Sequence, residues 1–111
     1  MARAATTTDA FNAIAEPRRR QILDLLARGE RSVSDVVTAL GLPQPVVSKH
    51  LAVLHHVGLV QVRAEGRHRL YRVDGRPLKS ISDWLAGYER AVNQRFARLD
   101  SVLARISEEE S

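Results

Sequence analysis

The stretch from Leu42 to Gly58 constrains the fold most, because it predicts one helix with a marked start and a marked end. Pro43 and Pro45 stand in the first turn, where backbone N–H groups lack helical partners and proline costs little. Gly58 follows the last apolar residue, where a left-handed glycine commonly ends a helix. Between these ends, apolar residues at spacings of four and three predict one buried face: Val47, Leu51, Leu54 and Val57.

The opposite face of this helix carries short or polar side chains and no carboxylate. Its members are Gln44, Pro45, Ser48, Lys49, Ala52 and His56. A solvated surface helix usually mixes Glu with Lys, whereas a helix that enters a DNA groove has to avoid carboxylates that face phosphate. The lack of acidic residues therefore favours a nucleic-acid partner.

A second helix precedes this one, across a short turn. Ser32 is placed to cap a helix, with Asp35 three residues later in a variant of the capping box, and Gly41 breaks the chain after Leu40. Two helices joined by a three- to four-residue turn that contains glycine predict a helix-turn-helix, whose second helix reads the DNA major groove.

Two further helices are expected before it. We expect residues 1–8 to form a flexible tail. Thr8 or Asp9 can cap a short first helix. Pro17 is expected to start a second helix, which stops at Gly29. The basic run 18–20 in that helix has two open interpretations: a solvated shoulder, or a contact with phosphate or with a second copy.

Residues 59–64 and 67–73 predict two strands joined by a turn at Glu65 and Gly66, which gives a hairpin with a polar and basic tip. From Pro77 a long helix is expected almost to the end. It carries apolar residues at strict intervals of seven (Leu78, Leu85, Val92, Leu99, Ile106) and a second row of Ile81, Tyr88 and Val102. A helix of about 30 residues is about 45 Å long, more than so small a domain can cover. We therefore expect a homodimer.

Charge and composition narrow the function classes. The net charge is +4, and residues 43–76 hold six basic residues against two acidic ones, a balance that favours a polyanionic partner. There is no cysteine, so thiolate metal sites and disulfides are excluded. No run approaches the roughly 18 apolar residues of a membrane span, and the first residues lack the apolar core of a signal peptide. We expect a soluble, cytoplasmic protein without membrane contact.

Catalytic and metal-binding constellations are missing from the sequence. Ser48 and His50 are two apart on a helix and do not face each other, and no glycine-rich phosphate loop is present. His55 and His56 are adjacent and diverge on a helix, which makes them a poor pair for one ion. Trp84 and Tyr88 could line a small-ligand pocket, although such a pair more often belongs to a core. We expect no enzyme, no cofactor and no metal; a small-molecule effector stays open.

These motifs resemble the ArsR-type winged-helix repressors of bacteria over about residues 9–90. The segment 15–23, AEPRRRQIL, is similar to the family's ADPTRRxIL opening, and Gln44–Leu51 with Leu54 and Gly58–Val60 resembles its QPxVSxHLxxLxxxGLV signature. Gly66 and Arg67 followed by Tyr71 and Val73 resemble its wing. The resemblance implies a homodimer built through the first and last helices that binds an inverted repeat in a promoter and blocks transcription.

Two departures from the family pattern matter. Pro43 stands where the family often has a serine that caps the recognition helix, so a side-chain cap is absent. Ser32-Val33-Ser34-Asp35 stands where metal-sensing members carry Cys-x-Cys, and residues 76–111 contain no histidine for the family's other metal site. Hydroxyl groups are poor ligands for soft metals. We therefore expect a member that does not respond to metal.

The sequence thus predicts a mainly α winged helix-turn-helix fold of about five helices and one two-stranded hairpin, dimerising through the terminal helices. The expected parts are a tail (1–8), a DNA-binding core (9–76) and a dimerisation helix with an acidic end (77–111). The expected function is that of a transcriptional repressor that binds double-stranded DNA as a homodimer, at a specific inverted-repeat operator, and does not respond to metal. The alternative is a winged-helix module that binds protein and has no sequence-specific DNA binding. The predicted DNA-binding residues are Gln44, Pro45, Ser48, Lys49, His50, Arg63, Arg67, His68 and Arg69. The predicted dimerisation residues are Phe11, Leu78, Ile81, Leu85, Tyr88, Val92 and Leu99.

Overall fold

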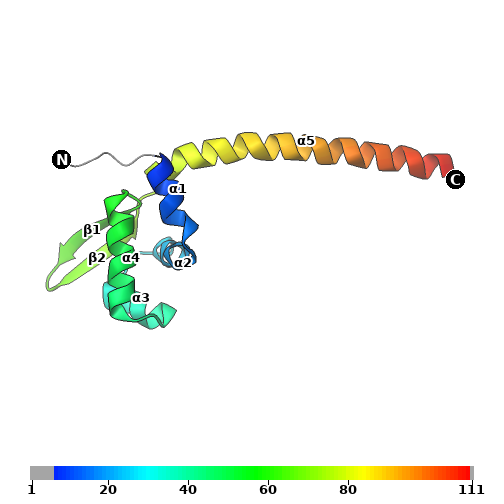
Figure 1. Ribbon diagram of the computed structural model, residues 1–111. Coiled ribbons are helices and arrows are strands. Elements are labelled where there is room, and N and C mark those ends of the chain that lie inside the picture. The colour runs from blue at the N-terminus through cyan, green and yellow to red at the C-terminus, as the bar shows by residue number, and fades with distance from the viewer. Residues whose placement is uncertain (1–6, 111) are drawn as a thin grey trace. The chain divides into compact units, whose positions relative to one another are not determined.

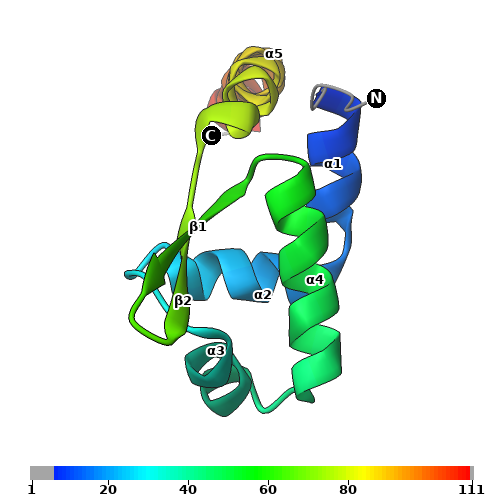
Figure 2. The same ribbon diagram turned by 90° about the vertical axis from the view of Figure 1, so that its left-hand side faces the viewer.

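The computed structural model describes residues 7–110 and divides the chain into two compact units, one up to Lys79 and one from Ser80 onward. The first unit contains four helices and a hairpin: α1 (Thr7–Ala15), α2 (Pro17–Leu26), α3 (Val33–Leu40), α4 (Gln44–His56), β1 (Val60–Glu65) and β2 (His68–Val73) (Figure 1). The predicted mainly α winged helix-turn-helix fold is confirmed. In Figure 2, α3 lies at the N-terminal end of α4, and the hairpin stands to one side of α4.

The ends of the helices follow from local hydrogen bonds. The Glu16 carboxylate caps α2 by accepting from the backbone N–H groups of Arg18 (2.8 Å) and Arg19 (3.1 Å). The predicted capping box of α3 is present: Ser32 Oγ accepts from Asp35 N at 3.2 Å, and Asp35 Oδ2 accepts from Ser32 N at 3.3 Å. α1 begins at Thr7, within the segment 1–8 that the sequence analysis assigned to a tail; residues 1–6 lie outside the described residues.

The hairpin turn lies one residue later than predicted. Val60 pairs with Val73 and Glu65 with His68, so the two turn residues are Gly66 and Arg67 rather than Glu65 and Gly66. Gly66 has φ +60°, and no residue other than glycine has a positive φ in the described chain. A glycine at the first of two turn positions is typical of the type II′ hairpin, whose twist matches that of the strands.

A third extended segment joins the hairpin, and the sequence analysis missed it. Arg31, in the loop before α3, exchanges two backbone hydrogen bonds with Tyr71 of β2, at 3.0 and 2.8 Å. Arg31 is flanked by Glu30 and Ser32, without the alternating apolar pattern that predicts a strand. These two bonds attach the hairpin to the start of the helix-turn-helix.

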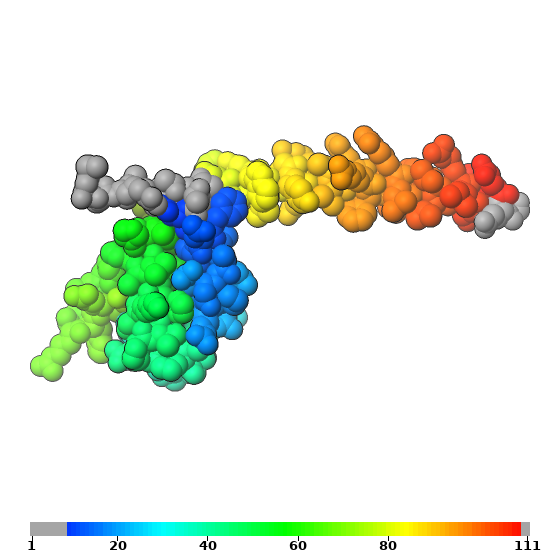
Figure 3. Space-filling model, viewed as in Figure 1, coloured from blue at the N-terminus to red at the C-terminus, as the bar shows by residue number. Residues whose placement is uncertain are grey.

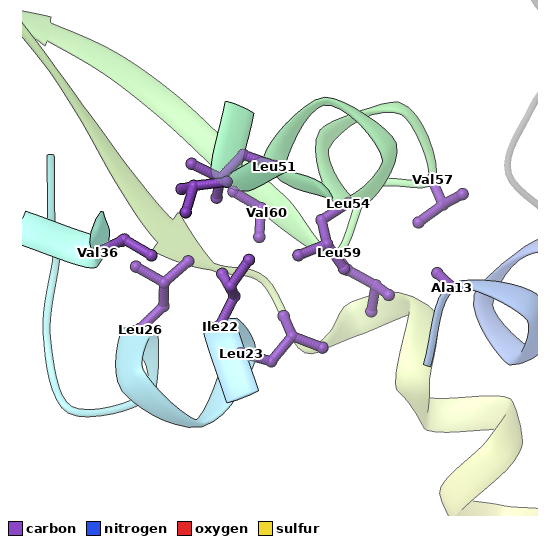
Figure 4. Packing of buried hydrophobic residues seen from close by; sticks show 11 residues of the cluster. Ala13, Ile22, Leu23, Leu26, Val36, Leu51, Leu54, Val57, Leu59 and Val60 are labelled. Atoms are coloured by element: carbon purple, nitrogen blue, oxygen red, sulfur yellow. The ribbon is translucent and has the colours of Figure 1, made fainter. Parts of the chain in front are cut away.

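One apolar core holds the first unit together. It is made by α2, α3, α4 and the start of β1, and Figure 4 shows their side chains converging. The largest fully buried members are Ile22, Leu26, Val36, Val47, Leu51, Leu54, Leu59 and Val60. Each such side chain contributes about 1.5–3 kcal/mol when it leaves water. The predicted inner face of α4 is confirmed, because Val47, Leu51, Leu54 and Val57 are all buried.

The second unit is one long helix. After a 3-10 turn, η1 (Arg76–Leu78), α5 runs from Lys79 to Glu110 and has 32 residues, which corresponds to about 48 Å. The long helix therefore begins two residues after Pro77, its predicted start. Eight of its large apolar side chains are exposed: Trp84, Leu85, Tyr88, Phe96, Leu99, Val102, Leu103 and Ile106. None of the helices described is long and apolar enough to cross a membrane.

Candidate nucleic-acid interface

The turn between α3 and α4 fixes the exposed face of α4. Gly41 caps α3 in the left-handed region (φ 65°, ψ 27°), and its N–H donates to Val37 O. Leu42 packs against the core, and α4 then begins at Gln44. α3 and α4 pack on each other, as the two members of a helix-turn-helix do.

The outer face of α4 presents the predicted groups to solvent. Gln44, Pro45, Ser48 and Lys49 are all exposed, and α4 contains no acidic residue in its thirteen positions. Gln44 and Ser48 are four residues apart and therefore neighbours on one side of the helix. This face can donate and accept hydrogen bonds and carries positive charge.

The first turn of α4 lacks a side-chain cap. Pro43 occupies the capping position with φ −59° and ψ 144°, and its carbonyl accepts from Val46 N (3.0 Å) and Val47 N (3.1 Å). The absence of a serine cap, expected from the sequence, is therefore a feature of the structure.

His50, which the sequence analysis placed among the DNA-binding residues, does not share the outer face of α4 with Gln44, Ser48 and Lys49. Its side chain lies on the inner side of α4, and the residue is 9% exposed. Its Nε2 is 3.8 Å from the Glu16 carboxylate, and its Nδ1 is buried without a hydrogen-bond partner in the described chain. Burial lowers the pKa of His50; Glu16 opposes this shift, and Arg19, Arg18 and Lys49 add to it. His50 is therefore a neutral, packed residue at pH 7.

Glu16 is ionised beside it. Burial opposes ionisation, but the hydrogen bonds from Arg19 N and Arg18 N, aided by the nearby positive groups, lower the pKa of Glu16. The sequence analysis did not single out Glu16. A carboxylate directly before a proline that starts a helix is the signal that could have found it.

The tip of the hairpin is basic and exposed. Arg67, His68 and Arg69 all lie in solvent, and the tip projects from the helices in Figure 3. In the register of the hairpin, Arg69 lies opposite Ala64 and His68 opposite Glu65. All three predicted side chains are therefore accessible to a binding partner.

Arg63, which the sequence analysis grouped with Arg67, His68 and Arg69, differs from them because its side chain is already paired with carboxylates of the chain. Its guanidinium forks onto Glu30, with Nε 2.8 Å from Oε2 and Nη2 2.9 Å from Oε1. Nη2 also lies 3.2 Å from Glu65 Oε2. The hydrogen bond lowers the pKa of Glu30 and raises that of Arg63. Two carboxylates therefore offset the positive charge of this guanidinium.

The base of the hairpin is closed by Asp74. Its N–H donates to Leu59 O at 2.7 Å, and its carboxylate accepts from Gln61 Nε2 at 3.1 Å and from the Arg76 guanidinium. The hydrogen bonds from the side chain and backbone of Arg76 hold the pKa of Asp74 well below its ordinary value. Arg76 is thus bound within the chain.

The basic run in α2 has a structural role that neither of its two interpretations contained. Arg19 donates to Ala13 O (2.7 Å) and Asn12 O (3.2 Å), and Arg20 donates to Ile14 O (2.7 Å) and Ala15 O (3.1 Å). These carbonyls belong to the last turn of α1, where backbone acceptors have no helical donor. Two of the three arginines therefore cap α1.

The predicted dimerisation residues divide into two groups. Ile81 is only 4% exposed and so presents little of the apolar surface that its predicted role requires. Leu78 is half-buried and packs against the core of the first unit. Leu85, Tyr88 and Leu99 are exposed, as is Phe11 of α1, and Val92 is half-buried. The rings of Trp84 and Tyr88 stack with centroids 5.8 Å apart.

The described chain has a small cavity beside α3, but its lining does not suit a typical small-molecule ligand. A cavity of about 320 Å³ lies between α3 and the hairpin, lined by Ser32, Asp35, Glu65, His68 and Leu70. Its lining is mostly polar, unlike the apolar walls of a typical ligand pocket. Among residues 7–110, no three His, Asp or Glu side chains come together so that they could hold a metal ion.

Comparisons with known proteins point to one family. The family model described as "Bacterial regulatory protein, arsR family" matches residues 16–62. The regulator Rv0324 of Mycobacterium tuberculosis is 48% identical over 63 residues, which are 57% of this chain and 28% of Rv0324. The probable mercury resistance operon repressor of Streptomyces lividans is 40% identical over 68 residues, 61% of this chain and 54% of that protein. The chain thus spans less than two thirds of the length of these two relatives.

A solved structure agrees over a larger share. The homodimeric winged helix-turn-helix DNA-binding domain of Mb0332 from Mycobacterium bovis, a possible ArsR-family transcriptional regulator, is 36% identical to this chain. The superposition has a TM-score of 0.59 and covers 78% of each chain. The matches are to transcriptional regulators and not to enzymes, as the sequence predicted.

Proposed function

The chain belongs to the arsR family of bacterial regulatory proteins, and from this membership we propose that it is a homodimeric repressor that binds a specific sequence of double-stranded DNA. One observation carries the proposal furthest. The second helix of the helix-turn-helix exposes Gln44, Ser48 and Lys49 on a face without a carboxylate. Such a face fits the major groove, where acidic side chains would meet phosphate.

The two basic regions have different tasks in this proposal. Gln44 is the best candidate to read a base, because a glutamine amide pairs with adenine through two hydrogen bonds. Arg67, His68 and Arg69 at the hairpin tip bind the phosphate backbone, which positions the protein without specifying sequence. Ser48 and Lys49 contact base edges and the adjacent phosphates.

A homodimer follows from the exposed apolar face of α5. Large apolar side chains along most of a 32-residue helix need a partner that removes them from water. A two-fold dimer presents two recognition helices and therefore binds an inverted repeat. Mb0332, which shares the fold, is homodimeric.

The test is a DNA titration with the purified protein. Duplexes are first selected by the protein from a randomised library, and binding to the selected duplex is then compared with binding to a scrambled one at several salt concentrations. We expect tighter binding to the selected duplex and affinity that falls with salt. Equal or undetectable binding to both duplexes at low salt would instead support a winged-helix module that binds protein.

Regulation by metal is not expected. One relative is a probable mercury resistance operon repressor, but the present chain has no cysteine and carries Ser32 and Ser34 in place of thiolates. Zinc, cadmium, arsenite and nickel at modest molar excess should leave the affinity for the selected duplex unchanged, as measured by fluorescence anisotropy. Release of the duplex that EDTA reverses would contradict this prediction and would point to a site built from histidines.

A further inference from the structure

The ion pair between Glu30 and Arg63 joins two parts of the chain that lie far apart in sequence. Glu30 stands in the loop before α3, and Arg63 stands in β1 of the hairpin. Both bonds of the fork are short, 2.8 and 2.9 Å, and planar guanidinium–carboxylate forks fix orientation as well as distance. The pair therefore constrains how the hairpin lies on that loop.

The neighbouring residue adds a second attachment at the same place. Arg31 N donates to Tyr71 O at 3.0 Å, and Tyr71 N donates to Arg31 O at 2.8 Å. Arg31 fixes β2 through the backbone, and Glu30 fixes β1 through its side chain. Together they hold both strands of the hairpin against the segment that leads into the helix-turn-helix.

The charges at this point argue against a direct role in DNA contact. Arg63 is shared by Glu30 and Glu65, and the charge of Arg72 also acts on Glu30, so these two bases and two acids have no net charge. Arg67 and Arg69, further along the hairpin, are exposed. Phosphate is attracted to those residues more strongly than to the neutral cluster.

We propose that Glu30 and Arg63 form a positioning pair, which sets the orientation of the hairpin so that Arg67 and Arg69 reach the phosphate backbone of duplex DNA. The acidic Glu30 thereby strengthens the binding of a polyanion. This inference rests on the proposed DNA-binding function. It assigns Arg63 an indirect role in place of the phosphate contact that its charge suggests.

Arg63→Lys and Arg63→Gln test the role of Arg63. Lysine keeps the charge and can bind phosphate, but it cannot make the two-bond fork. A positioning role predicts that both variants bind the selected duplex about fivefold more weakly. Loss of one exposed ion pair changes an equilibrium constant by a small factor, and a dimer contains two such pairs. It also predicts the same salt dependence for both variants, because both lose the orientation of Arg67 and Arg69 in the same way. Lysine that retains wild-type affinity, or a salt dependence that is flatter for Arg63→Gln than for Arg63→Lys, would assign Arg63 to phosphate and overturn the proposal.

Glu30→Gln tests the other half of the pair. The variant removes a negative charge from a DNA-binding protein, and simple electrostatics predicts tighter binding. The positioning role predicts weaker binding, again by about fivefold, with faster hydrogen exchange at the amides of Arg31 and Tyr71. Glu65→Gln is the matched control: it also removes a carboxylate from Arg63 but leaves the fork intact, and it should bind as well as the wild type or slightly better. Unchanged or tighter binding by Glu30→Gln contradicts the proposal.

Failure of the positioning role can be told apart from failure of the proposed function. If the wild type binds neither duplex, DNA binding itself is wrong; if the wild type binds and the variants match it, only the positioning role is wrong. Melting by circular dichroism checks each variant, and little change is expected because exposed ion pairs contribute little to stability. Should Glu30→Gln fail to fold, Glu30→Asp shortens the carboxylate by one methylene and is expected to show the same decrease in affinity; wild-type affinity for that variant counts against the proposal.

Discussion

Gln44 and Arg67 differ in the part of the duplex that each can reach, and their substitution should differ accordingly. Gln44→Ala removes a pair of hydrogen bonds to one base, so we expect binding to the selected duplex to weaken by about 1–3 kcal/mol, with a relaxed preference at one position of each half-site. Arg67→Ala should weaken binding to all sequences alike, and its salt dependence should be flatter by about one unit of slope for each phosphate that the arginine no longer neutralises. Titrations of both variants on selected and scrambled DNA measure the two effects. Equal decreases on the two duplexes for Gln44→Ala would show that the groove assignment is wrong.

His50 should make the stability of the protein depend on pH. Burial lowers its pKa below the ordinary value of 6.5, against the attraction of Glu16 and together with the repulsion of Arg19, Arg18 and Lys49. The unfolded chain therefore takes up the proton first, and stability that is complete above about pH 6.5 decreases as the pH falls below it, by at most about 1.4 kcal/mol per pH unit.

Urea unfolding between about pH 7.5 and 5.5, where the carboxylates stay ionised, measures this effect. His50→Gln should remove much of the slope of unfolding free energy against pH. His56→Gln, which changes an exposed histidine of the same helix, should leave the slope unchanged. An identical slope for wild type and His50→Gln would contradict the assignment.

The identity of the exposed residues could be predicted from the sequence, but not their partners. The period of a helix was enough to separate Gln44 and Lys49 from Val47, because periodicity is a local property. In the sequence, Arg63 and Arg67 are both arginines of a basic hairpin, and nothing distinguishes their roles. Only the fold brings an acidic residue of a distant loop to one of them, and no local pattern specifies the path of that loop. The burial of His50 could not be predicted for a related reason, since a histidine tolerates both the inner and the outer side of a helix.

Among the elements, the start of α3 offers the clearest test of a local hydrogen-bond motif. Ser32→Ala removes the side-chain cap from Asp35 N, and we expect the free energy of unfolding to fall by about 1 kcal/mol. Ser34→Ala, two residues further on and exposed, is the control and should be neutral or slightly stabilising, because alanine has the higher helix propensity. Chemical denaturation of the two variants decides the matter. Equal stability of both would mean that the box contributes nothing.

Helices and their ends were predicted better than the hairpin. Proline, glycine and Ser-x-x-Asp signals act within a few residues, so the bounds of α2, α3 and α4 lay close to those expected. The turn was misplaced by one residue because Glu65 and Gly66 both suit turn positions; the register depends on how the whole strand pairs. The bridge from Arg31 to Tyr71 joins residues remote in sequence and leaves no periodic trace.

At the scale of the molecule, the state of association should depend on α5. Leu99 is exposed on the apolar face of that helix, and Leu99→Glu would place an unpaired charge in the proposed dimer interface. We expect the wild type to sediment as a dimer at micromolar concentration and Leu99→Glu to shift towards monomer. Ala97→Glu introduces the same charge two residues away, on a different face of the helix, and should stay dimeric. A wild type that sediments only as monomer would contradict the dimer.

The bridge between Arg31 and Tyr71 has a consequence for the order of folding events. A hairpin closed by a two-residue turn forms from neighbouring residues within microseconds. Tyr71 and Arg31 are distant in sequence, so bringing them together costs more loop-closure entropy. The hairpin can therefore attach only after α2 and the loop between α2 and α3, which contains Arg31, are in place. The hairpin should therefore dock late, after the rate-limiting barrier of folding. Its contacts with the loop before α3 should then slow unfolding and have little effect on the rate of folding.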